Sequence, residues 1–181
     1  MSTFGGIPIN LKQLPIDVLI ASSNKCLEGV PGIGFVIANK QIFSNSIGNA
    51  KTLSLDLADQ WLKMERSSQW RFTPPTHVMA ALSKALDLLE DEGGVAGRFA
   101  RYWENSSILI EGMTTLGFTP LLSNNIQSPI IVTFKELNHQ NYNFDEFYFS
   151  LQRRGYTIYP GKLTNVPSFR VGCIGHIKAD D

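Results

Sequence analysis

Two short apolar runs near the start of the chain have the pattern of β-strands. Residues 16–21 (IDVLIA) and 33–38 (IGFVIA) are nearly continuous and rich in branched side chains, which is typical of strands buried on both faces of a sheet. The connection between them is too short for a crossover helix, so we expect antiparallel neighbours or separate positions in a sheet. Lys25 then lies just beyond the end of the first strand.

Apolar residues recur at helical spacing over the middle of the chain. Residues 53–64 place leucine, tryptophan and methionine side chains on one face. Thr76 is a natural N-cap for a second helix, which continues to about Glu92 and ends at a glycine pair. A longer helix is expected over residues 95–116, where Gly117 ends it.

Short elements follow Gly117 and predict a small α/β layer. Strands are expected at residues 129–134, 156–159 and 169–173, with a helix at 143–154. We expect the domain boundary within the long helix near Ser106, so that residues 1–105 and 106–181 form two α/β units.

The composition excludes several classes of protein. The chain has 181 residues, of which 43% are hydrophobic and 18% charged, as in globular proteins. Sixteen basic and sixteen acidic residues cancel, so no net field attracts nucleic acid or an anionic membrane. No apolar stretch reaches the roughly twenty residues that span a bilayer. Two cysteines without metal spacing and the absence of a signal peptide predict a cytoplasmic protein that binds small ligands.

The sequence gives little support for a dinucleotide-binding motif, a metal site or a cysteine nucleophile. The glycines at 29, 32 and 34 are followed by a strand, whereas a dinucleotide fingerprint needs a strand before it and a helix starting inside it. The three histidines have no carboxylate or cysteine at ligand spacing, so no metal site is expected. Neither Cys26 nor Cys173 has a histidine nearby in sequence, which leaves open only a cysteine nucleophile with a remote partner.

Lys25 is the candidate with a chemical rationale. A lysine becomes a nucleophile toward carbonyl groups when burial and nearby cations lower its pKa, and a strand end holds it rigidly. Ser22, three residues earlier, offers a hydroxyl to a phosphate, as in pyridoxal phosphate sites. The alternative is a solvated lysine at a strand end, and spacing alone does not separate the two. For the first interpretation we expect the Lys25 amine to be shielded from water, beside a pocket that Arg170 also borders.

Sequence blocks along essentially the whole chain resemble one family. They include SSNKCLEGVPGIGF at 22–35, WRFTPPTHV at 70–78, LEDEGGVAGRFARY at 89–102, YPGKL at 159–163 and FRVGCIG at 169–175. In this order they resemble the 2-aminoethylphosphonate:pyruvate aminotransferases, which are class V, fold-type I pyridoxal phosphate enzymes, and the first two blocks are specific to that branch. The resemblance implies an α/β fold that forms the C-terminal part of such a transferase. Residues 1–105 would be the remnant of the large mixed-sheet domain, and residues 106–181 a small α/β domain.

The resemblance implies roles for single residues. Lys25 would bind the pyridoxal 5'-phosphate cofactor as a Schiff base and move the proton between substrate carbon and cofactor. Arg170 would bind the acidic group of the substrate, for which a planar guanidinium is suited. Ser22 and Thr73 would contact the cofactor, while Thr76 is either a further cofactor contact or only an N-cap.

The segment around Thr73 also implies an oligomeric state. The matching segment in the family reaches across a dimer interface to the partner's cofactor phosphate, so the resemblance implies a homodimer. Arg71, in the same segment, belongs either to this contact or to a structural ion pair.

The activity implied is transfer of the amino group of 2-aminoethylphosphonate to pyruvate, giving phosphonoacetaldehyde and alanine. A related class V aminotransferase that uses alanine or serine and glyoxylate is the alternative enzyme. The sequence lacks the family's aspartate for the pyridinium nitrogen, its phosphate-binding turn and the last helix of the small domain. We therefore expect a C-terminal fragment, and an inactive fragment or half-subunit that acts only by association is the third alternative.

Overall fold

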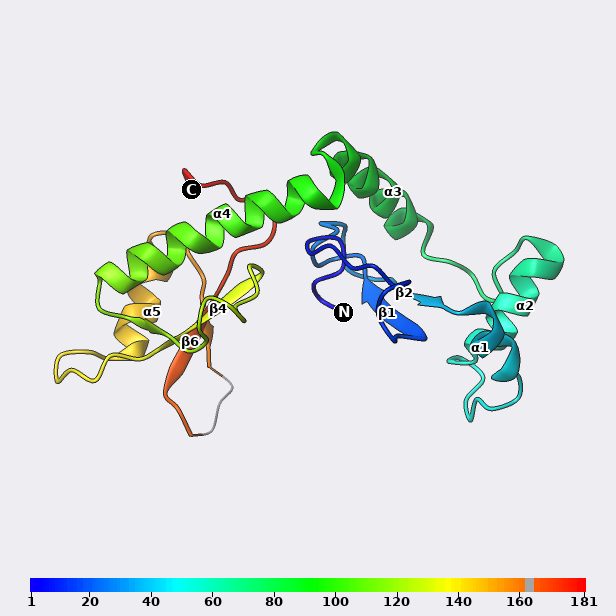
Figure 1. Cartoon of the computed structure of the whole chain (residues 1–181), viewed down its shortest axis with the longest axis horizontal. Helices are drawn as coiled ribbons and strands as arrows, with labels where there is room; N and C mark the ends of the chain where they lie inside the picture. The colour runs from blue at the N-terminus through cyan, green and yellow to red at the C-terminus, as the bar shows by residue number, and fades with distance from the viewer. Residues whose placement is uncertain (162–164) are drawn as a thin grey trace. The chain divides into compact units, whose positions relative to one another are not determined.

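The chain folds into two compact units. A computed structural model describes residues 1–161 and 165–181, and Figure 1 shows their course. The first unit comprises Met1–Phe4 and Ile9–Leu89, and the second comprises Gly5–Pro8 and Glu90–Asp181. The boundary expected near Ser106 lies inside helix α4 (Gly94–Thr115), all of which belongs to the second unit. The division into domains at residues 1–105 and 106–181 stays a prediction.

A two-stranded antiparallel ribbon begins the first unit. Strands β1 (Val18–Ser22) and β2 (Gly34–Ala38) pair along their whole length, with Val18 opposite Ala38 and Ser22 opposite Gly34. The predicted antiparallel pairing is thus confirmed. Burial of β1 on both faces is wrong: Leu19 and Ala21 are buried, whereas Val18 and Ile20 are exposed. The reason is that successive side chains of a strand point to opposite faces, and only one face is packed here.

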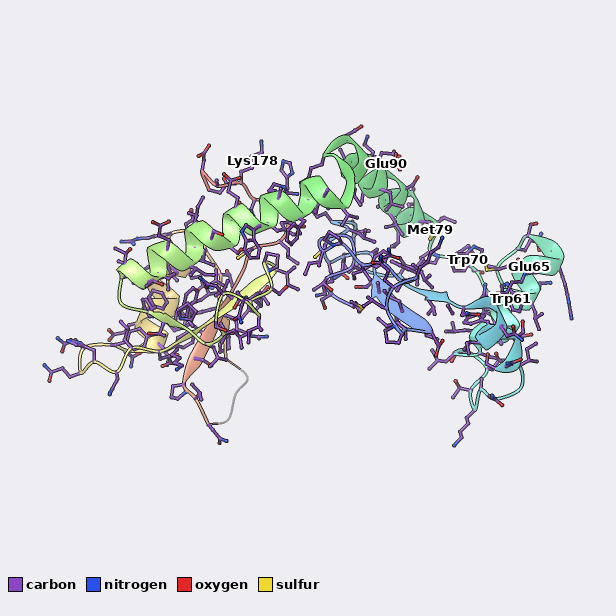
Figure 2. All side chains as sticks on the ribbon, in the orientation of Figure 1. Trp61, Glu65, Trp70, Met79, Glu90 and Lys178 are labelled. Atoms are coloured by element: carbon purple, nitrogen blue, oxygen red, sulfur yellow. The ribbon has the colours of Figure 1, made fainter. Side chains whose placement is uncertain are left out.

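Three helices follow the ribbon: α1 (Lys40–Asn45), α2 (Leu57–Ser67) and α3 (Thr76–Asp91). Helix α2 begins four residues later than the expected start at Leu53, because Asp56 is its N-cap. The Asp56 carboxylate accepts a hydrogen bond from the backbone N–H of Asp59 at 2.9 Å. Figure 2 labels Trp61 on this helix and Trp70 in the stretch that follows it.

Helix α3 begins at Thr76, one residue earlier than expected, because the sequence predicts Thr76 as the N-cap and not as the first helical residue. The Pro75 carbonyl accepts the first helical hydrogen bond, from the Met79 N–H at 3.0 Å. Pro75 therefore occupies the cap position, and Thr76 is the first helical residue. The helix ends as predicted at the glycine pair, where Gly93 and Gly94 have positive φ.

The second unit is a four-stranded antiparallel sheet with two helices. The strands are β3 (Thr119–Pro120), β4 (Ile131–Lys135), β5 (Tyr159–Pro160) and β6 (Ser168–Gly172), in the spatial order β3-β4-β6-β5. Helix α5 (Phe144–Arg153) connects β4 to β5, and Figure 1 shows α4 passing over the sheet. The fold is α/β, as predicted. In the described ranges, no helix combines the length and hydropathy required to cross a membrane.

The core of the second unit lies on one face of this sheet. Val132, Phe134 and Phe169 are fully buried, and they pack with Phe118 against side chains of α4 and α5. The Phe169 ring makes an edge contact with that of Phe118 at 5.3 Å between centroids. The intervening residues of β4 and β6, among them Arg170, point to the opposite face.

The C-terminal segment is attached to α4 by hydrogen bonds. The Arg101 guanidinium donates to the Gly175 carbonyl at 2.6 Å, and the Asn105 amide donates to the Ile177 carbonyl at 2.9 Å. Figure 1 shows this segment running back beside the helix, and Figure 2 labels Lys178 on it. The strand that carries Arg170 is therefore followed by a stretch held to the longest helix.

Candidate active site

Lys25 lies in a turn that directly follows β1. The backbone N–H of Ser23 donates to the Ile33 carbonyl at 3.2 Å, and that of Gly29 donates to the Ser23 carbonyl at 2.8 Å. Inside this loop the Glu28 N–H donates to the Lys25 carbonyl at 2.9 Å. The backbone of Lys25 is thus held by hydrogen bonds on both sides.

Ser23 and Gly29 explain why this sequence forms the turn. The fully buried Ser23 hydroxyl donates to the Val30 carbonyl at 2.6 Å. A Cβ on Gly29 would lie 2.9 Å from the Ser23 carbonyl oxygen, which is closer than side chains tolerate. Glu28 has a φ of 57°, in the left-handed region. Sequence reasoning selected Ser22 and missed Ser23, whose partner lies seven residues further along the chain.

The side chain of Lys25 is exposed, so the expected shielding of its amine is wrong for this chain. Its neighbours Ser23, Cys26 and Leu27 turn inward and are buried, and the lysine is left on the outer side of the turn. In residues 1–161 and 165–181 its amine has no hydrogen bond or ion pair. The half-buried Ser22, at the end of β1, likewise has an unpaired hydroxyl within the described part.

Thr73 and Thr76 lie beyond α2 in the same unit. Residues 68–74 line an open hollow of about 990 Å³, and both threonines are exposed. Arg71 in this segment contacts the Asp59 carboxylate at 2.5 Å and stacks on the Phe72 ring at 4.7 Å from its centroid. Arg71 therefore makes the structural ion pair, one of the two alternatives for this residue.

Arg170 lies in the middle of β6, on the sheet face opposite the core. It stands opposite Thr133 of β4 and Tyr159 of β5. Its Nε donates to the Pro160 carbonyl at 3.4 Å, and its guanidinium carbon lies 5.9 Å from the centroid of the Tyr159 ring. Among the residues described, no carboxylate pairs with this half-buried cation. Such a guanidinium is suited to a carboxylate or phosphonate.

The predicted site residues divide between the two units. Ser22 and Lys25 share one turn of the first unit, which also contains Thr73 and Thr76, whereas Arg170 belongs to the second. Their assembly into one site stays a prediction. Across the described ranges, no three histidine, cysteine or acidic side chains gather as metal ligands.

Comparison with known proteins gives a consistent family. The family model described as "Aminotransferase class-V" matches residues 1–172. A protein of Burkholderia lata named 2-aminoethylphosphonate–pyruvate transaminase 2 is 55% identical over 176 residues, which cover 97% of this chain and 47% of that protein. The chain thus spans about half the length of this curated relative.

Solved structures share the fold. The pyridoxamine-pyruvate aminotransferase from Mesorhizobium loti matches with a TM-score of 0.82 and 22% identity, covering 96% of this chain and 45% of that one. The PLP-bound phosphoserine aminotransferase from Trichomonas vaginalis matches with a TM-score of 0.77 and 19% identity, covering 96% and 47%.

The quoted sequence blocks lie within this match, apart from the last three residues of FRVGCIG, and the last two residues of YPGKL fall outside the described residues. The fold is that of fold-type I aminotransferases, as predicted. Since the family model extends over nearly all of the sequence, the chain belongs to the class-V aminotransferases.

Proposed function

We propose that this chain is part of a pyridoxal phosphate-dependent aminotransferase. The enzyme moves the amino group of 2-aminoethylphosphonate to pyruvate and forms phosphonoacetaldehyde and alanine. The name and 55% identity of the Burkholderia lata relative support this substrate pair. That identity carries the proposal, and Lys25, although exposed, adds a primary amine without an ion-pair partner in the described residues, on a turn with a fixed backbone.

The residues of this turn fit the cofactor in chemical type. Covalent attachment of an aldehyde needs a primary amine without a competing carboxylate, and Lys25 meets this condition in the described chain. A phosphate needs hydrogen-bond donors, and Ser22 offers a free hydroxyl three residues away. Thr73 and Thr76 offer two further exposed hydroxyls. These four residues are our proposed cofactor ligands.

Lys25 has two tasks in the proposed reaction. Its amine holds the cofactor between turnovers, and once released it takes and returns the proton at the substrate carbon. The bound cofactor supplies the electron sink that makes this proton acidic. The hydrogen bonds of Ser23 and Gly29 fix the lysine backbone, so motion is confined to the side chain. A fixed starting position lowers the entropy lost when the amine reaches the reacting carbon.

Arg170 is the proposed substrate ligand. The amino donor ends in a phosphonate and the acceptor in a carboxylate, and a guanidinium binds either through paired N–H donors. The same side chain therefore orients both substrates in the two half-reactions. A class V enzyme for alanine or serine and glyoxylate would use this arginine equally well, so the donor must be identified by assay.

We also propose that the enzyme acts as a homodimer in the cytoplasm. The segment of residues 68–74 exposes Trp70 and Phe72, side chains that a second subunit would cover. Cys26 and Cys173 form no disulfide among the described residues, in keeping with a reducing compartment.

Attachment of the cofactor to Lys25 tests the proposal directly. The purified chain is mixed with pyridoxal phosphate and treated with borohydride, and peptide mass spectrometry locates the fixed cofactor. We expect it on Lys25, with the visible absorbance band lost in Lys25→Ala and kept in Lys40→Ala. Lys40 is the matched control, because it is also exposed and also follows a strand.

Turnover is measured on the same preparation. Alanine formed from pyruvate and 2-aminoethylphosphonate supports the full proposal, whereas glycine formed from glyoxylate with alanine or serine as donor, and no alanine from 2-aminoethylphosphonate, favours the related activity. Labelling of Lys25 without any turnover supports the inactive half-subunit. Cofactor spread evenly over exposed lysines contradicts the proposed role of Lys25.

A further inference from the structure

The polar face of the second unit's sheet carries a row of three side chains in register. Thr133, Arg170 and Tyr159 stand opposite one another on β4, β6 and β5. Directly opposed side chains on one sheet face lie about 5 Å apart at Cβ and interact. The core lies on the other face, and on this one Tyr159 is exposed while Thr133 and Arg170 are half-buried.

Two contacts restrict the guanidinium of Arg170. The Nε hydrogen points to the Pro160 carbonyl at 3.4 Å, and the guanidinium carbon lies 5.9 Å from the centre of the Tyr159 ring. An aromatic face within about 6 Å attracts a cation. The hydrogen bond to Pro160 occupies the Nε edge of the guanidinium, and the contact with the Tyr159 ring limits the tilt of the guanidinium plane.

These contacts decide which edge of Arg170 remains for a ligand. A guanidinium presents five N–H donors, and a carboxylate or phosphonate binds two parallel ones. With Nε used by Pro160, the remaining pair is formed by Nη1 and Nη2. An oxyanion would then bind end-on, in line with the side chain.

We propose that Tyr159 is a positioning residue for Arg170, fixing the guanidinium so that its two terminal nitrogens bind the oxyanion headgroup of the substrate. The role of Arg170 as substrate ligand rests on the proposed function, whereas its restriction by Tyr159 is independent of it. The ring carries this role, and the hydroxyl does not. Loss of an exposed cation–π contact then weakens oxyanion binding by about two- to five-fold.

Nuclear magnetic resonance of the arginine side chains tests this inference on the 181-residue chain without cofactor. The Arg170 Nε–Hε signal is assigned by its loss in Arg170→Lys, and methylphosphonate is the probe ligand. We expect a ring-current shift of this signal and hydrogen exchange slower than that of Arg66, an exposed arginine. Both should persist in Tyr159→Phe and be lost in Tyr159→Leu. The dissociation constant for methylphosphonate should rise about two- to five-fold only in Tyr159→Leu.

Tyr156→Leu is the matched control. Tyr156 is 55% exposed and Tyr159 is 54% exposed, but Tyr156 lies outside β5 and its hydroxyl bonds to the Asp181 carbonyl. An unchanged Arg170 signal and affinity in Tyr159→Leu would overturn the positioning role. A normal ring-current shift with no methylphosphonate binding in any variant would instead contradict Arg170 as substrate ligand. The signal of the unmodified chain is informative even if Tyr159→Leu fails to fold, because absence of the ring-current shift there also overturns the inference.

Discussion

The carboxylate of Glu92 holds two arginines of α4, and its removal is the most informative perturbation of the second unit. Its oxygens accept from Arg98 Nε at 2.6 Å and from Arg101 Nε at 2.7 Å. Arg101 in turn holds the segment that follows β6. Glu92→Gln keeps the shape and one acceptor oxygen but removes the charge. We therefore expect loosening that extends from the start of α4 to the C-terminal segment.

The size of the effect follows from burial. The Arg98 side chain is only 2% exposed, and breaking one partner from a buried ion pair costs roughly 3–5 kcal/mol. Glu92 itself is 23% exposed, so water screens part of the loss and we expect the lower limit, about 3 kcal/mol. This corresponds to about two orders of magnitude in the local opening equilibrium. The exposed Glu90, on the same stretch, is the matched control as Glu90→Gln.

Hydrogen exchange read by mass spectrometry measures both variants. Protection of peptides from residues 94–105 and 173–177 should fall in Glu92→Gln and stay unchanged in Glu90→Gln. Burial raises the pKa of Glu92, but hydrogen bonds and charges of Arg101 and Arg98 outweigh it, and the folded pKa is lowered from 4.5. Its stabilisation is present above the unfolded pKa and is lost as pH falls through the folded one. The difference between the variants should thus shrink below about pH 4.5. Equal protection of both variants at neutral pH would refute the reasoning.

Two further substitutions test the turn of the first unit and the core of the second. Gly29→Ala places a Cβ 2.9 Å from the Ser23 carbonyl oxygen, so exchange over residues 22–34 should rise by the equivalent of about 1–3 kcal/mol and cofactor attachment should fall. Gly112 is a helical position with open space around it, so Gly112→Ala should leave exchange over residues 22–34 and cofactor attachment unchanged, and it should slightly strengthen α4. An equal effect of the two glycine substitutions would contradict the steric argument. Phe169→Ala removes a fully buried ring and should cost the second unit about 3–5 kcal/mol in urea unfolding, whereas Phe149→Ala, at an exposed ring, should cost little. Similar urea midpoints for Phe169→Ala and Phe149→Ala would contradict the position of the core described for the second unit.

The long helices could be predicted from the sequence because two signals coincide in them. Apolar side chains recur at the helical period, and a glycine with positive φ follows the end of both α3 and α4, namely Gly93 and Gly117. Their observed limits therefore lie within a residue or two of the expected ones. The antiparallel ribbon was predictable for a different reason, since the connection between its strands leaves no room for a crossover.

The shortest elements carry no such signal. Helix α1 buries none of its six residues, so no apolar period marks it. Strands β3 and β5 have two residues each, and pairing with β4 and β6 sets their position, so β5 shares only Tyr159 with the strand expected over residues 156–159. Likewise the run of branched residues in β1 marks a strand but cannot tell one packed face from two, which is why the exposure of Val18 and Ile20 was missed.

In the candidate site, too, features set by neighbouring residues could be predicted, and contacts between residues distant in sequence could not. The sequence could single out Lys25 as a candidate because a strand end and a turn are local features, whereas the Ser23 bond to Val30 and the Tyr159 contact with Arg170 depend on how distant residues meet. Each of these two restraints lies entirely within one compact unit. Because each restraint is complete within its own unit, the lysine turn and the Arg170 guanidinium are each preorganised without the other. Loss of one by mutation should then leave the local geometry of the other intact. A change in the Arg170 signal on substitution of Gly29 would show that the two are coupled and that this division is wrong.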